Sequence, residues 1–362
     1  MSNSEVLTNP QIDALHQRMA DNSLGGHWQP RQENIPVLVP FVWQWSAIYS
    51  CLMESGEIIR IGGINDAAKR RTVNLINPAI AKHKATSRTM QMSVQLVKPG
   101  EMAECHRHTA GALRFVVEGD GTGYSNVEGE QMIMEPNDLV LTPNWTWHDH
   151  QNPGTKNLVW LDVLDSHLTT HLDATFHENY ADNPTQQNYF KGSVQTIVHT
   201  DGYCRQRLGA VRVRTSNPEN RAFPYAYKWR DTLQALKDMD AAGQRDPSEG
   251  VLVEYTNPLT GGPTLPTISC RAQLLAPGEA TRPHRQTSST IYHVIQGKGV
   301  TTVGAKKGGG KELEWGLRDC FFVPSKEWRH HRNTSKTEPA ILFSVTDQPV
   351  LEALGLYRDE LG

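Results

Sequence analysis

The amino-acid sequence predicts an all-β fold made of two antiparallel barrels. From about Thr89 the chain alternates short apolar runs with Gly, Pro and Asn turns, a pattern typical of sandwiches and barrels. The same pattern then returns, because TMQMSVQLVKPGEMAECH resembles TISCRAQLLAPGEATRPH and Pro99-Gly100 has a counterpart in Pro277-Gly278. This period is far longer than the roughly 20–50 residues of solenoid repeats. The repeat therefore indicates one duplicated barrel.

Four segments follow one another along the chain of 362 residues, a length that fits more than one domain. Residues 1–88 are predicted to form a loop-rich arm with an amphipathic helix starting at Pro10. Residues 89–165 form the first barrel, which we expect to be the catalytic one. Residues 166–262 are expected to form a linker that includes a stretch predicted to be helical (TLQALKDMDAAG), and residues 263–362 the second barrel.

Composition excludes several classes of protein. The formal net charge is −3, without the basic surplus that nucleic-acid binding needs. The apolar runs are far shorter than the ~20 residues of a membrane helix. The N-terminal residues do not show a basic start followed by an apolar core, so we expect no secretory signal. The cysteines lack a CxxC pattern, which disfavours a disulfide framework and favours a reducing cytoplasm; they are Cys51, Cys105, Cys204, Cys270 and Cys320.

Histidines of the first barrel form the most informative pattern. His106 and His108 are two positions apart, so both can face the barrel interior from one strand. His148, in a later strand, can complete a set of three imidazoles. Imidazole suits first-row metals, and three protein ligands with open positions suit catalysis better than structure. An isolated HxH is a weak signal, so the prediction of a metal site depends on its spacing to the later motif.

That spacing resembles the paired motifs of the cupin superfamily: G-x-x-x-x-x-H-x-H from Gly100, then P-x-x-x-x-H-x-x-x-N from Pro143. The glutamate ligand common in cupins is absent, since Ala112 and Leu113 occupy its expected positions. Three neutral imidazoles leave a divalent metal its full charge, which favours an anionic, chelating substrate. Arg114 could bind a carboxylate through two hydrogen bonds. The alternative for Arg114 is a surface ion pair.

Longer stretches resemble the gentisate 1,2-dioxygenase family, which includes salicylate and 1-hydroxy-2-naphthoate dioxygenases. The matching texts include VWQWS, AKRRTVNLINP, HRHTAGALRFVVEGDG, LTPNWTWHDH and LFSVTDQPVLEALGLYR, from about Val42 to the C-terminus. The resemblance implies a bicupin, a homo-oligomer that is often a tetramer, and one Fe(II) in the N-terminal barrel. It also implies that dioxygen opens a small aromatic acid between the carbons bearing the carboxylate and the adjacent hydroxyl.

By position, the resemblance assigns the iron to His106, His108 and His148. It assigns catalytic and substrate-contacting roles to Arg114 and His150. His150 is a candidate proton acceptor or hydrogen-bond donor, because imidazole titrates near the working pH. Further predicted substrate-binding positions are Arg70, Gln91, Gln95 and Asp162.

One departure from the family concerns the substrate. Known members read Trp-Ala-Gly where this chain has Gln91-Met92-Ser93, so an aromatic wall becomes polar and flexible. We therefore expect a substrate that is gentisate or a related salicylate with a polar 5-substituent. Salicylate, 5-nitrosalicylate and 1-hydroxy-2-naphthoate stay open as alternatives.

The second barrel loses the predicted ligands. His106 corresponds to His284, His108 to Gln286 and His148 to Arg329. We expect this barrel to bind no iron and to serve structure and oligomerisation. A weaker alternative is an unrelated second site built from His293, His330 and His331.

Two other classes of function compete with the dioxygenase. One is a ligand-binding cupin without redox chemistry, and the other is a zinc or manganese cupin that hydrolyses or isomerises its substrate. Arg114 and Arg70 beside a three-histidine site disfavour the first. Fold alone cannot separate these classes, because one fold hosts many functions.

Overall fold

The computed structural model describes residues 10–24, 28, 36–61, 70–128, 130–180, 225–258, 260–304, 306 and 309–362. It comprises two compact units, Met1–Val37 and Leu38–Gly362. The first contains α1 (Pro10–Asp21), which confirms the helix predicted from Pro10. Cys204 and much of the predicted linker lie outside the described residues. The predicted domain boundaries stay a prediction.

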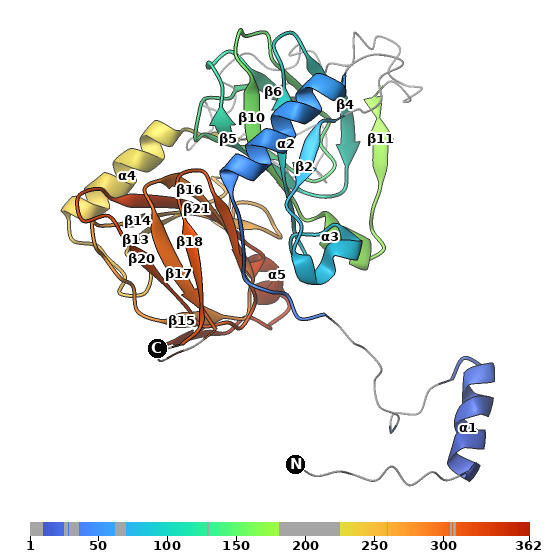
Figure 1. Ribbon diagram of the computed structural model, residues 1–362. Coiled ribbons are helices and arrows are strands. Elements are labelled where there is room, and N and C mark those ends of the chain that lie inside the picture. The colour runs from blue at the N-terminus through green and yellow to red at the C-terminus, as the bar shows by residue number, and fades with distance from the viewer. Residues whose placement is uncertain are drawn as a thin grey trace. The chain divides into compact units, whose positions relative to one another are not determined.

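Two sheets form the N-terminal barrel (Figure 1). Their strand orders are β12-β8-β5-β10-β3-β2 and β11-β4-β9-β6-β7. The strands are β2 (Thr72–Asn74), β3 (Gln91–Val97), β4 (Met102–His108), β5 (Ala112–Glu118), β6 (Tyr124–Val127), β7 (Glu130–Ile133), β8 (Leu139–Thr142), β9 (His148–Gln151), β10 (Leu158–Leu164), β11 (His177–Asn179) and β12 (Ala226–Tyr227).

The C-terminal barrel repeats this arrangement, with strand orders β1-β19-β16-β21-β14-β13 and β18-β17-β20-β15-β22. The all-β prediction and the duplication are thereby confirmed. The strands are β1 (Phe41–Trp43), β13 (Val251–Tyr255), β14 (Ser269–Leu275), β15 (His284–Gln286), β16 (Thr290–Gln296), β17 (Gly299–Val303), β18 (Lys311–Trp315), β19 (Cys320–Val323), β20 (Arg329–Asn333), β21 (Ala340–Thr346) and β22 (Asp359–Leu361).

Short helices flank the barrels. Helix α2 packs on β2 and β3, and α4 packs on β13 and β14, so each covers one barrel (Figure 1). The helical elements are α2 (Trp45–Ile58), the 3-10 helix η1 (Pro78–His83), α3 (Ser166–His171), α4 (Trp229–Ala241) and α5 (Gln348–Ala353). Within the described part of the chain, no helix is both long enough and apolar enough to cross a membrane.

The two halves exchange edge strands. Strand β1 precedes the first barrel yet pairs with β19 of the second, while β12 precedes the second barrel yet pairs with β8 of the first. Each strand leads into a helix that an aspartate of the same host barrel caps. Asp319 Oδ1 accepts from Trp45 N at 2.7 Å, and Asp138 Oδ1 accepts from Trp229 N at 2.9 Å. The duplicated unit therefore includes elements outside the barrels.

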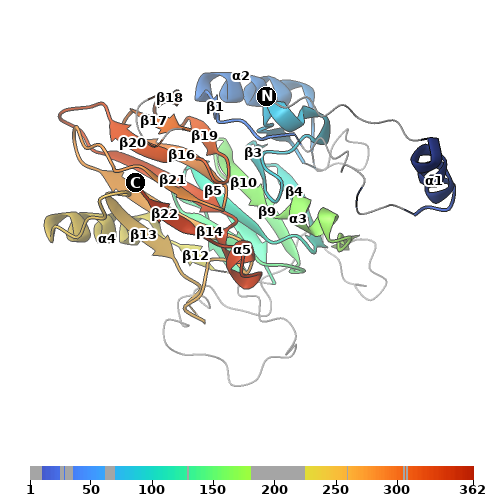
Figure 2. The same cartoon turned by 90° about the horizontal axis from the view of Figure 1, so that it is seen from below.

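Strand alternation places the main core between the barrels. One face of β3 buries Met92, Val94 and Leu96 in this shared core. Phe115 of β5 stacks on Phe343 of β21 with ring centroids 4.1 Å apart, where strands of the two barrels face each other (Figure 2). The opposite face of β3 turns into the N-terminal barrel, where the polar residues Gln91, Ser93 and Gln95 precede Val97.

Candidate metal centre and anion pocket

Three histidines converge inside the N-terminal barrel. His106 and His108 lie on β4, and the register places His148 of β9 directly opposite His106. One ring nitrogen from each histidine lies within 4.8 Å of the others, which makes this the only potential metal group of three or more His, Cys, Asp or Glu among the described residues. The structure thus brings the predicted metal ligands together.

Backbone carbonyls orient all three rings. Each Nδ1 lies beside the carbonyl oxygen of a residue two positions away. For His108 and His148, Nδ1–H donation there leaves Nε2 as the ligand atom, whereas His106 Nδ1 also meets the donor Arg70 Nη2. The distances are 3.1 Å from His106 to Glu104, 2.8 Å from His108 to Ala110 and 2.9 Å from His148 to Thr146. His148 Nε2 is buried without a hydrogen-bond partner among the described residues. This donor set fits a divalent metal ion.

Electrostatics keep these rings neutral, the form that binds metal. Burial lowers the pKa of His106, and the Arg70 charge lowers it further. Burial, followed by the Arg114 charge, lowers the pKa of His108 to about 4. Burial also places the pKa of His148 well below its ordinary value. No proton has to leave the three imidazoles for metal binding near neutral pH.

Arg114 lies on the facing sheet, beside Asp162. It stands opposite Asp162 in the β5–β10 register, with Arg114 Nε 3.4 Å from Asp162 Oδ1, and only 2% of Arg114 is exposed. Arg114 Nε and Nη1 have no hydrogen-bond partner among the described residues, and neither has the buried Gln95 Nε2. Buried polar groups normally have partners, so these donors indicate a place for an anionic ligand.

Arg70, in the segment before β2, extends to strand β4, which carries His106 and His108. Its Nη2 donates to the Glu104 carbonyl oxygen at 2.6 Å and contacts His106 Nδ1. Burial, with the Arg114 charge, lowers the pKa of Arg70 to about 10, so the side chain stays cationic at neutral pH. A second cation therefore stands beside the histidines.

His150 is fully buried near the same centre. Its Nδ1 lies 2.7 Å from Ser125 Oγ, while its Nε2 has no hydrogen-bond partner among the described residues. Burial, followed by the Arg114 and Arg70 charges, lowers the pKa of His150 well below its ordinary value. The ring is therefore neutral and can exchange a proton or a hydrogen bond with a ligand through Nε2.

Gln91 lies on the same face of β3 as Gln95, nearer the end of the strand. Its Nε2 donates to the Met92 carbonyl oxygen at 2.8 Å and to Thr86 Oγ1 at 3.2 Å, and its Oε1 lies 3.3 Å from His167 Nε2. The wall here is polar, as the sequence indicates. The roles of Gln91, Gln95 and Asp162 toward a substrate stay predictions.

Sequence reasoning missed the strand that completes the metal-binding sheet. β11 pairs with β4 and places His177 opposite His108, and Asn179 opposite His106. Its three residues are too few for an alternating pattern. A usable signal is the duplication, because Glu178 pairs with Arg107 just as Glu360 pairs with Arg285 at the same register in the second barrel.

At the same register in the second barrel, a different set of side chains replaces the three histidines. His284 stands opposite Arg329, as His106 stands opposite His148. Glu249 fills this site from the loop before β13. Its Oε1 lies 2.9 Å from His284 Nε2 and 3.8 Å from Arg329 Nη2. Gln273 Nε2 donates to the other carboxylate oxygen at 2.8 Å.

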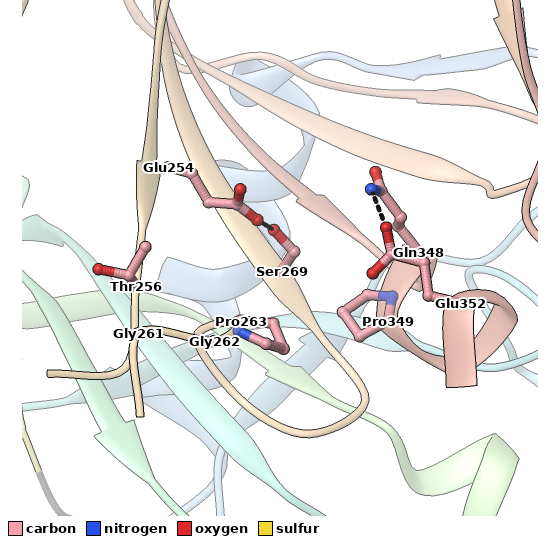
Figure 3. A pocket seen from close by; sticks show the side chains of 9 residues that line it. All are labelled: Glu254, Thr256, Gly261, Gly262, Pro263, Ser269, Gln348, Pro349 and Glu352. Carbon is pink, nitrogen blue, oxygen red and sulfur yellow. Dashed lines mark hydrogen bonds between the residues drawn. The ribbon is translucent and has the colours of Figure 1, made fainter. Parts of the chain in front are cut away.

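A separate cavity of about 220 Å³ lies near α5 and the loop after β13 (Figure 3). Two acidic side chains line it, and both are already bonded. Ser269 Oγ donates to Glu254, and Gln348 Nε2 donates to Glu352 Oε1 at 2.7 Å. No histidine or cysteine is among the residues that line this cavity, so it does not resemble the three-histidine group.

Fold and site together define a two-barrel protein with a three-histidine group that could hold a metal ion. The family model described as Cupin domain matches residues 93–164 and 272–346, one match in each barrel. The chain is 38% identical to a 5-aminosalicylate 1,2-dioxygenase of Comamonas sp., with 96% of this chain and 90% of that protein covered. It is 36% identical to a gentisate 1,2-dioxygenase of Haloferax sp., with 88% and 87% covered.

A solved structure matches over the whole length. It is a variant of the salicylate 1,2-dioxygenase of Pseudoaminobacter salicylatoxidans in complex with gentisate, with a TM-score of 0.83, 27% identity and coverage of 100% of this chain and 98% of that one. The chain belongs to the family of gentisate and salicylate 1,2-dioxygenases, which are oxidoreductases. This confirms the resemblance and the bicupin fold that the sequence predicts.

Proposed function

We propose that the protein is an iron(II)-dependent dioxygenase that opens the ring of a 2-hydroxybenzoate between the carbons bearing the carboxylate and the hydroxyl. One observation carries the proposal: a three-histidine group shares one barrel interior with buried donors of Arg114 and Gln95 that have no hydrogen-bond partner in the part of the chain that the structure describes. A cationic site of this kind suits an aromatic acid that offers a carboxylate and an adjacent hydroxyl.

Each residue has a role that follows from its position. His106, His108 and His148 would hold one iron(II) per chain, and bound iron(II) would supply the one-electron chemistry that lets dioxygen react with an aromatic ring. Arg114 and Gln95 bind the carboxylate, and Asp162 orients Arg114. Arg70 adds positive charge beside His106. His150 accepts or donates a proton at the substrate hydroxyl through Nε2.

The ring substituent is the finer part of the proposal. Gln91 and Ser93 give β3 a polar inner face, and Gln91 is bonded to His167. A hydroxyl or amino group at the 5-position would find partners on such a wall, which favours gentisate and 5-aminosalicylate. The similarity to a 5-aminosalicylate 1,2-dioxygenase agrees with this choice. We further propose that the enzyme acts in the cytoplasm as a homotetramer.

Anaerobic loading with Fe(II), followed by oxygen uptake on a substrate panel, tests the function. The panel contains gentisate, 5-aminosalicylate, salicylate, 5-nitrosalicylate and 1-hydroxy-2-naphthoate, and ring-opened products are followed by ultraviolet absorbance. We expect one dioxygen consumed per ring opened. Tight binding of these acids without oxygen uptake would support a non-redox binding protein, while activity with Zn or Mn and no oxygen uptake would support a hydrolase or isomerase.

A further inference from the structure

A buried carboxylate holds the peptide group that orients His108. The carbonyl oxygen of this group belongs to Ala110 and lies 2.8 Å from His108 Nδ1. The N–H of the same group belongs to Gly111 and donates to Asp165 Oδ1 at 2.8 Å. A trans peptide is planar, so its carbonyl and its N–H point in opposite directions and can only turn together. Asp165 therefore fixes the carbonyl to which His108 is bonded.

His148 has the same arrangement. The Thr146 carbonyl oxygen lies 2.9 Å from His148 Nδ1, and the N–H on the other side of that peptide group, at Trp147, donates to Glu128 Oε1 at 2.7 Å. Hydrogen bonds in a chain polarise one another, so a carboxylate at the far end strengthens the bond between carbonyl and imidazole. Such outer partners fix the orientation of a metal-binding histidine and raise its basicity.

The backbone at Glu128 supports a role for its side chain. Glu128 has a φ of 50°, in the left-handed region that favours glycine. In the second barrel Gly304 occupies this position, with a φ of 107°. Gly304 N donates to the Trp328 carbonyl oxygen at 2.8 Å, as Glu128 N donates to that of Trp147 at 2.9 Å. Glycine thus satisfies the turn, and the barrel with the three histidines has a carboxylate there instead.

The second barrel anchors Asp165. Asp165 is 1% exposed, and its other oxygen, Oδ2, accepts from Thr267 Oγ1 at 2.5 Å. Thr267 lies just before β14 of the second barrel. The peptide group that orients His108 is therefore positioned by a contact between the two barrels.

The duplication repeats this contact without the imidazole. Asp347 Oδ1 accepts from Ser289 N at 2.8 Å, and Asp347 Oδ2 accepts from Thr89 Oγ1 at 2.6 Å. Gln286 stands there at the position of His108. The contact therefore joins the barrels on both sides, but a histidine depends on it only in the N-terminal barrel.

We propose that Glu128 and Asp165 are positioning residues that hold His148 and His108 in the orientation that binds the metal ion. This inference rests on the metal centre of the proposed function. Each carboxylate acts through one peptide group and is not itself a ligand. Imidazoles that are oriented before the metal arrives lose less freedom on binding, so both carboxylates raise the affinity for a divalent metal.

The first test removes one carboxylate without straining the fold. Glu128→Gly introduces a residue that adopts this φ freely, so the thermal unfolding temperature of the metal-free protein should change little. We expect the affinity for Fe(II), measured by anaerobic titration, to fall about tenfold. The visible bands of the Co(II)-loaded protein should shift, because they report coordination geometry. Glu128→Gln keeps an acceptor oxygen and should restore both the affinity and the bands.

The second test uses the duplication as its control. Asp165→Ala and Asp347→Ala each remove a buried carboxylate and a contact between the barrels, so their losses of stability should be similar. Only Asp165→Ala should lower the Fe(II) affinity, again about tenfold. Should either variant fail to fold, Thr267→Val and Thr89→Val give the same comparison through milder changes.

Three outcomes would count against these assignments. Wild-type Fe(II) affinity in Glu128→Gly would overturn the inference. Equal losses of affinity in the two barrels' matched variants would overturn it as well, since the effect would then belong to barrel packing. A wild-type protein that binds no Fe(II) would instead refute the metal centre of the proposed function.

Discussion

The two barrels place opposite charges at the same register position. In the N-terminal barrel, His106 faces His148, and the residue that enters from the preceding segment is the cation Arg70. In the C-terminal barrel, His284 faces Arg329, and the residue that enters is the anion Glu249. The same fold therefore has a cationic site in the N-terminal barrel, whereas in the C-terminal barrel a carboxylate of the chain itself occupies the site.

This difference shows how a buried cation can stand at the register position of a histidine without loss of the fold. Arg329 puts a buried charge into the barrel, and an unpaired buried charge is strongly destabilising. Glu249 compensates for that charge. Burial alone would raise the pKa of Glu249, but the hydrogen bond from His284 and the charges of His284 and Arg329 lower it to about 2. The second site is an internal ion pair at neutral pH.

The largest expected effect comes from removing a predicted metal ligand of the N-terminal barrel. His148→Ala removes a ligand that carbonyl hydrogen bonding orients, and we expect metal affinity and activity to fall by more than about a hundredfold. The matched variant His284→Ala should leave metal stoichiometry and kcat unchanged, although it destabilises the second barrel. Elemental analysis and oxygen uptake measure both. Equal metal loss in the two variants would show that the second barrel also binds metal.

Next in size is the internal anion of the second barrel. Glu249→Gln leaves Arg329 without its charge partner, and we expect the free energy of unfolding to fall by about 3–5 kcal/mol at pH 7. The pKa of Glu249 is about 2 when folded, below its ordinary value of 4.5. Its stabilisation is therefore complete above about pH 4.5 and is lost as pH falls toward 2.

Urea unfolding measured at several pH values tests that prediction. The difference between wild type and Glu249→Gln should be constant from pH 7 to 5 and shrink below pH 4.5. Glu314, which is exposed on β18, gives the control, because Glu314→Gln should leave stability nearly unchanged at every pH. A Glu249→Gln difference that grows on acidification would contradict the assigned ion pair.

A smaller effect concerns the anion pocket of the first barrel. Arg114→Lys keeps a charge beside Asp162 but loses the planar fork that binds a carboxylate twice. We expect kcat/KM to fall about 10- to 150-fold, mostly through KM, with metal content unchanged. Tyr292 is the register counterpart of Arg114 in the second barrel, opposite Ser344. Tyr292→Phe should leave kcat/KM as it is, and an unchanged Arg114→Lys variant would remove Arg114 from the pocket.

The sequence predicts the barrels and the three histidines because both depend on local patterns. Strand alternation places His106 and His108 on one face, and the spacing to His148 is a recurring motif. Glu249 and His177 escape such reasoning. Glu249 stands in a loop, and its partners Gln273, His284 and Arg329 meet it only through folding. The exchange of β1 and β12 between barrels is equally invisible, because no local signal says which sheet an edge strand joins.

The smallest expected effect concerns the hydroxyl beside the fourth histidine of each barrel. Ser125 Oγ lies 2.7 Å from His150 Nδ1 and 3.2 Å from Met134 Sδ, whereas Thr301 Oγ1 lies 2.8 Å from His331 Nδ1. Thr301 Oγ1 also accepts from Trp315 Nε1 at 2.9 Å. A thioether only accepts and an indole N–H only donates. The Ser125 hydroxyl therefore donates away from its histidine, toward Met134, whereas the Thr301 hydroxyl can donate to His331.

When Ser125 Oγ donates its proton to Met134, the same oxygen can accept a hydrogen bond from His150 Nδ1–H. His150 Nε2 then carries the lone pair that can accept from a ligand. Ser125→Ala should therefore lower kcat about three- to tenfold without metal loss, and Ser125→Thr should restore it. Thr301→Val, the matched change in the second barrel, should leave kcat unchanged. Oxygen uptake at saturating substrate decides the matter: if Ser125→Ala and Thr301→Val lower kcat equally, the effect belongs to barrel packing and not to His150.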